Sequence, residues 1–239
     1  MTAPPSIDHL KTTLPIHNPE AFLKAACEQF GTITLASSMG AEDQVLTHMI
    51  RTTNLPISIF VLDTGRLHQE TYSVMSKTQN RYDFRYRVFF PKTDDVESMV
   101  STHGPNLFYD TIELRKRCCY VRKVEPLGRA LSGQTGWITG QRREQAVTRS
   151  DLGVVEWDDG HRLLKFNPLA AWTTEQVWDY IRTHSIPYNI LHDKGFPSIG
   201  CAPCTRAIKP GDDLRSGRWW WEDPDKKECG LHIKTEEPR

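Results

Sequence analysis

The chain has no excess charge of either sign, no long apolar run and no repeated or low-complexity tract. Its 239 residues include 30 Lys and Arg and 30 Asp and Glu, so the formal net charge is zero. Proteins that bind nucleic acids usually carry a basic excess, and the neutral balance argues against such a partner. No stretch approaches the ~18 consecutive apolar residues of a transmembrane helix, so no membrane partner is expected. Any anion-binding site must therefore be local.

The amino terminus also lacks the features of a secretory signal. Its first eight residues contain neither a basic segment nor an apolar one, so we expect a cytoplasmic protein whose thiols stay reduced. The six cysteines are therefore interpreted as ligands, nucleophiles or buried residues before disulfides are considered. With 38% hydrophobic and 25% charged residues, the composition supports a folded core of one large domain or two small ones.

The spacing of apolar residues predicts an α/β fold with a mostly parallel sheet flanked by helices. Asn18 and Pro19 are typical of a helix start, and apolar residues follow them at helical spacing. We expect helices at 19–30, 42–52, 67–81, 93–102 (capped by Thr93) and 113–131, and one that begins after Thr173 or Thr174. We expect strands at 32–37, 57–62, 85–90 and 136–140, and a hairpin that joins 154–157 to 162–166.

Regular patterns end near residue 185, where prolines and glycines become frequent. We therefore divide the chain into an N-terminal extension (1–18), an α/β domain (19–210) and a mobile C-terminal tail (211–239). The tail is rich in Cys, Arg and Trp but poor in regular structure. Such a segment indicates function rather than scaffold.

Two polar turns follow predicted strands and suggest a nucleotide cleft. The turn Ser37–Asp43 leads into a helix, whose first N–H groups suit a phosphate or sulfate. It lacks the lysine of a P-loop, so P-loop NTPase chemistry is not supported. The turn Asp63–Arg66 ends the next strand, and ligands of open α/β sheets lie beyond the carboxyl ends of strands. The alternative is an ordinary strand-to-helix turn capped by serine.

Two cysteine pairs predict a metal site. Cys201 and Cys204 form a C-x-x-C half-site for zinc or an iron–sulfur cluster, and Cys118 and Cys119 are adjacent. Adjacent side chains on a helix diverge by roughly 100°, which a cluster of several irons tolerates better than one zinc ion does. The alternatives are buried free thiols or a redox disulfide between Cys201 and Cys204. Basic residues suited to an anionic cluster surround the first pair: Arg115, Lys116, Arg117, Arg122 and Lys123.

The tail contains a candidate nucleophile, Cys229. Lys226 and Lys227 precede it and His232 follows it, and such cations lower a thiol pKa and favour the thiolate. The alternative is an exposed cysteine without a role. The tryptophans of Trp219–Trp221 are interpreted mainly as packing that holds the tail, and Cys27, on the apolar face of the first long helix, as a core residue.

Together these motifs resemble the assimilatory adenylyl-sulfate reductases, the iron–sulfur branch of the phosphoadenylyl-sulfate reductase family. The resemblance spans about residues 20–233. The segments that carry it are Ser37–Asp43, Leu62–Leu67, Cys118–Cys119, Gly140–Arg143, Cys201–Thr205, Gly217–Trp221 and Glu228–His232.

The resemblance implies the adenine-nucleotide α-hydrolase-like fold and thiol-dependent reduction of adenosine 5′-phosphosulfate to sulfite and AMP. It implies that Cys229 attacks the sulfur and that a thioredoxin or glutaredoxin-like dithiol releases sulfite. It also implies one [4Fe-4S] cluster per chain, held by Cys118, Cys119, Cys201 and Cys204, and leaves a homo-oligomer open. The substrate contacts that it implies are Ser37, Ser38, Gly40, Lys123, Gly140, Arg149, Arg215, Arg218 and His232.

Three alternatives remain at this point. The first is the same chemistry on 3′-phosphoadenylyl sulfate, although members that prefer this substrate usually lack both cysteine pairs. The second is an adenylating ATP pyrophosphatase on the same fold, which would leave Cys229 without a role. The third is a nucleotide-binding iron–sulfur or zinc sensor, which would bind ligand and release no sulfite.

Overall fold

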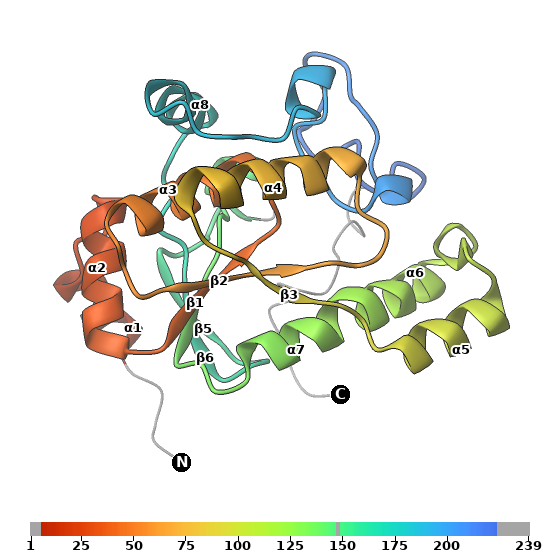
Figure 1. The fold of residues 1–239 in the computed structure, drawn as a ribbon, viewed down its shortest axis with the longest axis horizontal. Helices are drawn as coiled ribbons and strands as arrows, with labels where there is room; N and C mark the ends of the chain where they lie inside the picture. Colours follow the sequence, from red (N-terminus) through yellow and green to blue (C-terminus); the bar gives the residue numbers. More distant parts are fainter. Residues whose placement is uncertain (1–5, 147–148, 224–239) are drawn as a thin grey trace.

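The computed structural model describes residues 6–146 and 149–223, which form a mostly parallel six-stranded sheet with helices on both faces (Figure 1). The strand order is β3-β2-β1-β4-β6-β5, and only the β5–β6 pair of this sheet is antiparallel. The strands are β1 (Ile33–Ser37), β2 (Ser58–Leu62), β3 (Arg87–Phe89), β4 (Gly136–Ile138), β5 (Val155–Asp158) and β6 (Leu163–Phe166). The predicted α/β class is therefore confirmed.

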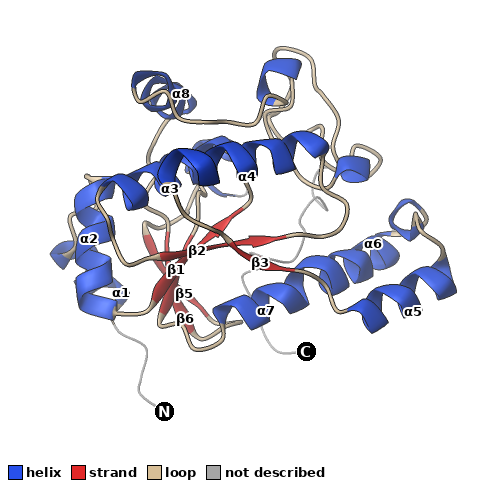
Figure 2. Cartoon of the chain, in the orientation of Figure 1, coloured by secondary structure: helices blue, strands red, loops and turns tan. Residues whose placement is uncertain are grey.

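The helices lie in two layers around this sheet (Figure 2). Helices α3 and α4 cover one face, with α8 beyond α3, and α7 covers the opposite face, where α5 and α6 extend it. The α-helices are α1 (Ile7–Thr13), α2 (Pro19–Phe30), α3 (Ala41–Thr52), α4 (Gln69–Tyr82), α5 (Thr93–His103), α6 (Ile112–Cys119), α7 (Glu125–Leu131) and α8 (Thr174–Thr183). None of the described helices is long and apolar enough to cross a membrane.

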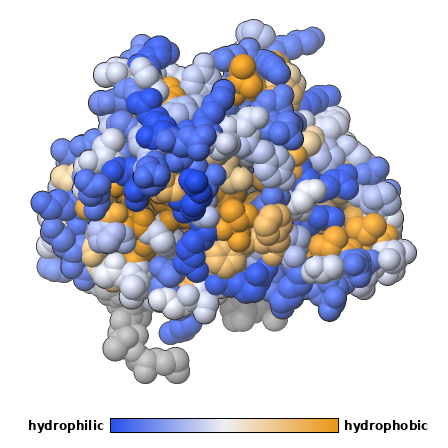
Figure 3. Space-filling model, viewed as in Figure 1, coloured by the Kyte–Doolittle hydropathy of each residue, from blue (hydrophilic) through white to orange (hydrophobic). Residues whose placement is uncertain are grey.

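Apolar side chains cover both faces of the sheet, as is usual for parallel strands. On one face, Leu35 and Val61 belong to the large core that includes α2 and α3. On the other, Phe60 and Trp137 pack with Leu127 of α7. The surface view shows a mostly hydrophilic exterior, with apolar side chains near the edge strand β3, where Phe90 is 55% exposed (Figure 3). Packing of both faces leaves the carboxyl ends of the strands as the place for polar side chains.

Most predicted elements match the structure within two residues, but two details were wrong. Helix α5 is preceded by Lys92 as N-cap without a side-chain bond, so Thr93 is its first residue and not its cap. The single helix expected over 113–131 is interrupted by a π-helical turn at Tyr120–Val124. The stretch expected as an N-terminal extension includes α1, whose Leu10 lies in the main core.

Candidate active site

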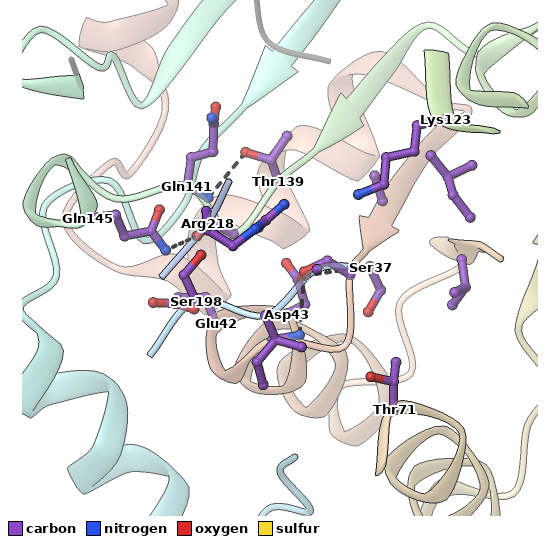
Figure 4. Close-up of a pocket in the computed structure, with 18 of the residues that line it drawn as sticks. Ser37, Glu42, Asp43, Thr71, Lys123, Thr139, Gln141, Gln145, Ser198 and Arg218 are labelled. Carbon is purple, nitrogen blue, oxygen red and sulfur yellow. Dashed lines mark hydrogen bonds between the residues drawn. The ribbon is translucent and has the colours of Figure 1, made fainter. Parts of the chain in front are cut away.

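A cavity of about 240 Å³ lies at the carboxyl ends of β1, β2 and β4 (Figure 4). Apolar side chains in its wall include Phe60, Leu127 and Trp137. Polar groups come from the β1–α3 turn, from Thr139–Gln141 and from the C-terminal segments 197–200 and 214–219. An apolar lining with a few convergent polar groups is the usual form of a small-molecule site.

The β1–α3 turn presents Ser37, Ser38 and Gly40 to this cavity. Gly40 is the N-cap of α3 and has no side-chain cap bond, so the first N–H groups of the helix need another partner. Met39 has a left-handed φ of 64°, is 1% exposed, and accepts a 3.4 Å contact from the Gln44 amide on its sulfur. The Met39 side chain therefore points into the core and does not line the cavity.

Asp43 joins the two turns that form the polar wall. Its Oδ2 accepts bonds from the Ser38 backbone N–H at 2.7 Å and from the Ser38 hydroxyl at 2.6 Å, and the Gly140 N–H also donates to the carboxyl. A Cβ on Gly140 would lie 2.4 Å from Asp43 Oδ1, so this approach requires glycine. Burial raises the pKa of Asp43 to about 6, although these hydrogen bonds oppose the shift.

A buried arginine that sequence reasoning missed supports the same wall. Arg142 is 3% exposed and donates to Glu42 at 2.9 Å, to Glu144 at 3.1 Å and to the Thr174 hydroxyl at 3.2 Å. It thus connects the start of α3 to the start of α8. The sequence contained the Gly-Gln-Arg-Arg motif but no local signal for a partner 100 residues away.

The predicted anion contacts converge on the cavity. Lys123, Arg149, Arg215 and Arg218 all line it, and Lys123 and Arg218 reach into it from different sides (Figure 4). The Arg149 guanidinium also donates to Gln145. Arg218 is only 7% exposed, and a Cβ on Gly200 would lie 2.4 Å from its Nη2. Space for this guanidinium therefore depends on the glycine.

The four cysteines line a second, smaller cavity beside the first. Cys118 and Cys119 end α6, Cys201 precedes the 3-10 turn Ala202–Cys204, and Cys204 is the last residue of that turn. Three residues line both cavities: Lys123, Arg218 and Trp219. The two cavities are therefore separated by one wall that carries two positive charges.

The Asp63–Arg66 turn contributes to the cysteine cavity through Arg66, whereas the residues on either side of the turn, Leu62 and Leu67, line the nucleotide cavity. Leu67 and Cys201 form an isolated antiparallel β-bridge, and the Thr64 hydroxyl lies 3.3 Å from Cys201 Sγ. Arg66 lines the cysteine cavity and not the larger one. Sequence reasoning missed this because the pairing joins segments far apart in the chain.

Buried cations surround the cysteines. Arg115 and Arg122 line their cavity, whereas Lys116 and Arg117 are exposed and do not. Lys123 lies in the π-helical turn that follows the first cysteine pair, and it lines both cavities.

Burial and the closeness of the other cysteines affect the protonation of the Cys204 thiol. Burial raises the pKa of Cys204 to about 12, with a further rise from Cys201 and Cys119. None of the five described cysteines is in a disulfide. Among the described residues, no group of three or more His, Cys, Asp or Glu is arranged to hold one metal ion. Four thiols around a shared cavity suit a cluster, which spreads its ligands over several irons, better than a single zinc ion.

The described part of the tail is held against this cavity. Trp219 is 1% exposed, and Phe108 and Tyr109 pack against Trp221. Packing thus accounts for two of the three tryptophans, as predicted. Cys27 is buried in the main core, also as predicted. The predicted nucleophile Cys229 and the predicted contact His232 lie outside the described residues.

Residues 32–207 match the family model described as the phosphoadenosine phosphosulfate reductase domain. The chain belongs to this family. Two proteins of the family described as adenosine 5′-phosphosulfate reductase are similar over most of their length. The one from Burkholderia cepacia is 51% identical over 219 residues, 92% of this chain and 88% of that protein. The one from Allochromatium vinosum is 51% identical over 229 residues, 95% of this chain and 90% of that protein.

Solved structures support the fold. A phosphoadenylyl-sulfate reductase from Candida auris, in a phosphate complex, aligns with a TM-score of 0.74 and 29% identity, covering 87% of this chain and 98% of that one. An FMN adenylyltransferase from Candida glabrata aligns with a TM-score of 0.56 and 15% identity, covering 99% of this chain and 79% of that one. The adenine-nucleotide α-hydrolase-like fold implied by the family is therefore confirmed.

Proposed function

We propose that this protein reduces adenosine 5′-phosphosulfate to sulfite and AMP, with a thioredoxin or glutaredoxin-like dithiol as donor, in the cytoplasm. The observation that carries the proposal is the shared wall. Lys123 and Arg218 line both the cavity at the strand ends and the cavity of the four cysteines. Relatives with 51% identity that are described as adenosine 5′-phosphosulfate reductases support the same choice.

The reaction requires a thiolate, which we assign to Cys229 in the tail. The thiolate attacks the sulfur of the phosphosulfate, an S–S bond forms, and the bond from sulfur to the phosphate oxygen breaks. AMP leaves with that electron pair and the enzyme holds an S-sulfocysteine. A donor thiolate then attacks Cys229 Sγ and releases sulfite with the S–S electron pair. The second donor thiol closes the donor disulfide and returns Cys229 as a thiolate, so the dithiol supplies both electrons.

The described side chains have complementary roles in this step. The apolar wall with Phe60, Leu127 and Trp137 suits the purine ring. The β1–α3 turn offers N–H groups at a helix start, a site that favours anions. Lys123, Arg149, Arg215 and Arg218 would neutralise the phosphosulfate and the leaving phosphate.

We further propose that the four cysteines hold one [4Fe-4S] cluster. The fit rests on their common cavity and on Arg115, Arg122 and Lys123 in its wall, since a four-thiolate cluster is anionic. When bound, the cluster would supply a fixed charge beside the substrate and a covalent tie between α6 and the Cys201–Cys204 turn. The dithiol, not the cluster, supplies the electrons.

The test is sulfite release from each of the two sulfonucleotides with a thioredoxin system. Adenosine 5′-phosphosulfate should be turned over far better than its 3′-phosphorylated form, with one AMP for each sulfite. Without reductant, the peptide that contains Cys229 should gain about 80 Da, the mass of a sulfonate, and Cys229→Ser should gain nothing. Equal or better turnover of the 3′-phosphorylated form would favour the alternative substrate. Nucleotide binding without sulfite release would favour the sensor.

The cluster has a separate test. Anaerobically purified protein should be brown and contain about four irons per chain, and Cys201→Ser should lose them. Zinc in place of iron in such a preparation would refute the cluster and leave the reductase assignment to the sulfite assay.

A further inference from the structure

We propose that Arg115 and Glu222 form a clamp that positions Arg218 in the nucleotide cavity. The proposal deepens the proposed function and rests on it for the identity of the ligand. The Arg115 Nε donates to Glu222 Oε1 at 2.9 Å and its Nη2 donates to Oε2 at 2.7 Å. The two side chains are 0% and 3% exposed. A two-pronged pair without solvent fixes both position and orientation.

The residue next to the clamp is strained. Trp219 has a φ of 41°, a left-handed conformation that bulky residues avoid unless their surroundings impose it. Two guanidinium groups lie over its indole, with Arg115 Cζ 4.8 Å and Arg218 Cζ 4.6 Å from the ring centre. The Arg115–Glu222 pair therefore contacts the Trp219 ring through Arg115, and Glu222 follows Trp219 three residues later in the chain.

This ring contributes to the placement of the Arg218 side chain. The Trp219 N–H donates to the Cys204 carbonyl at 3.1 Å and the Arg218 N–H to the Arg215 carbonyl at 2.9 Å, so the backbone is fixed on both sides of Arg218. The guanidinium occupies the space left by Gly200 and lines the nucleotide cavity. Release of the clamp frees the Trp219 ring from Arg115, and the Arg218 guanidinium, which lies over the same ring, then loses that support.

A buried ion pair that only stabilises the fold would not produce this coupling. In that case, loss of the pair lowers the free energy of unfolding but leaves the role of Arg218 intact. The effects of removing the pair and of removing Arg218 on the free energy of nucleotide binding would then add. If the pair acts through Arg218, the effects do not add. A double-mutant cycle separates the two explanations.

The experiment compares Glu222→Gln, Arg218→Ala and the double variant, with AMP as the probe and calorimetry as the readout. Glu222→Gln keeps the volume but removes the charge and turns an N–H toward Arg115. We expect the Kd of AMP to rise roughly 10-fold, the scale for loss of one charge-assisted hydrogen bond. In the Arg218→Ala background, Glu222→Gln should change the Kd less than 2-fold. Glu97→Gln, which removes an exposed carboxylate from α5, is the matched control and should bind as the wild type does.

Two further readouts do not depend on activity. Iron content and the visible spectrum of Glu222→Gln should match the wild type. Trypsin cleavage after Arg218, followed by intact mass, should be slow in the wild type and faster in Glu222→Gln, because the segment around Arg218 is then released. Arg115→Lys keeps the charge but loses the two-pronged contact with Glu222, so it should raise the Kd of AMP and speed trypsin cleavage if Glu222→Gln fails to fold.

The outcomes decide between the proposals. Additive losses of AMP affinity, or wild-type trypsin protection in both clamp variants, would overturn the clamp. A wild-type protein that binds no AMP and releases no sulfite would overturn the proposed function. The trypsin comparison would still test the clamp in that protein.

Discussion

Replacing Asp43 by asparagine should flatten the pH dependence of stability by an amount that can be worked out from the site. The pKa of Asp43 is about 6 in the folded protein and 3.8 when exposed, because burial disfavours the carboxylate. The folded state therefore holds this proton more tightly than the unfolded state. The stabilising contribution is fully present below pH 3.8 and is lost as the pH rises through 6.

The magnitude follows from the two pKa values. At 1.36 kcal/mol per pKa unit, a shift from 3.8 to about 6 corresponds to about 3 kcal/mol in the free energy of unfolding. Roughly half of this loss falls between pH 5 and pH 7.5. An asparagine does not titrate, so Asp43→Asn should lack this loss. Other carboxyl groups titrate in both proteins and cancel in the comparison.

The assay is urea unfolding of the wild type and Asp43→Asn at pH 5 and pH 7.5, with the cluster content checked in each sample. Asp94→Asn removes an exposed carboxyl from the first turn of α5 and serves as the control. Asp43→Asn should also bind AMP more weakly, because its amide N–H would face the N–H of Ser38 or Gly140. An identical pH dependence in wild type and Asp43→Asn would refute the placement of Asp43 as a buried carboxylate.

Three further changes probe other contacts. Gly200→Ala should weaken AMP binding at least 10-fold by calorimetry with iron retained, because its Cβ would lie 2.4 Å from Arg218 Nη2; unchanged affinity would contradict the location of Arg218. Lys123→Met should slow formation of the Cys229 sulfonate roughly 10-fold in quenched-flow measurements while iron content stays constant, and full-rate formation would remove Lys123 from the proposed step. Burial and the nearby His184 lower the pKa of His48, so the contribution of His48 to stability should fall as the pH drops below 6.5. In thermal unfolding, His48→Gln should lose less stability than the wild type over this pH range. An equal loss in both proteins would contradict this assignment.

Local signals in the sequence predicted the elements well. The bounds of α2 match the prediction because its cap and its end are encoded by neighbours: the Asn18 side chain accepts from the Ala21 N–H at 3.1 Å, and Gly31 follows the last turn. The cap of α8 is likewise local, since Thr173 and Gln176 bond each other reciprocally. Where a short-range bond decides the structure, residue type and spacing were sufficient.

Contacts between distant segments were beyond that reasoning. The bond of Arg142 to Glu42 and the clamp of Arg115 to Glu222 join residues 100 or more positions apart. The prediction placed two turns at one nucleotide cleft because both follow strands of the same sheet. In the structure the β-bridge between Leu67 and Cys201 brings the second turn to the cysteines as well, and Arg66 lines their cavity while Leu67 lines the nucleotide cavity.

The chain has zero net charge, yet cations gather in the wall that its two cavities share. Lys123 and Arg218 stand between two cavities that we assign to anions, and each cation can interact with both. Two anionic groups a few ångströms apart repel strongly where water is scarce, so cations in the shared wall lower the free energy of holding both at once. A buried acid forms an ion pair with a neighbouring arginine, as Glu222 does with Arg115. The zero net charge of the chain is thus compatible with a local excess of cations between the two cavities.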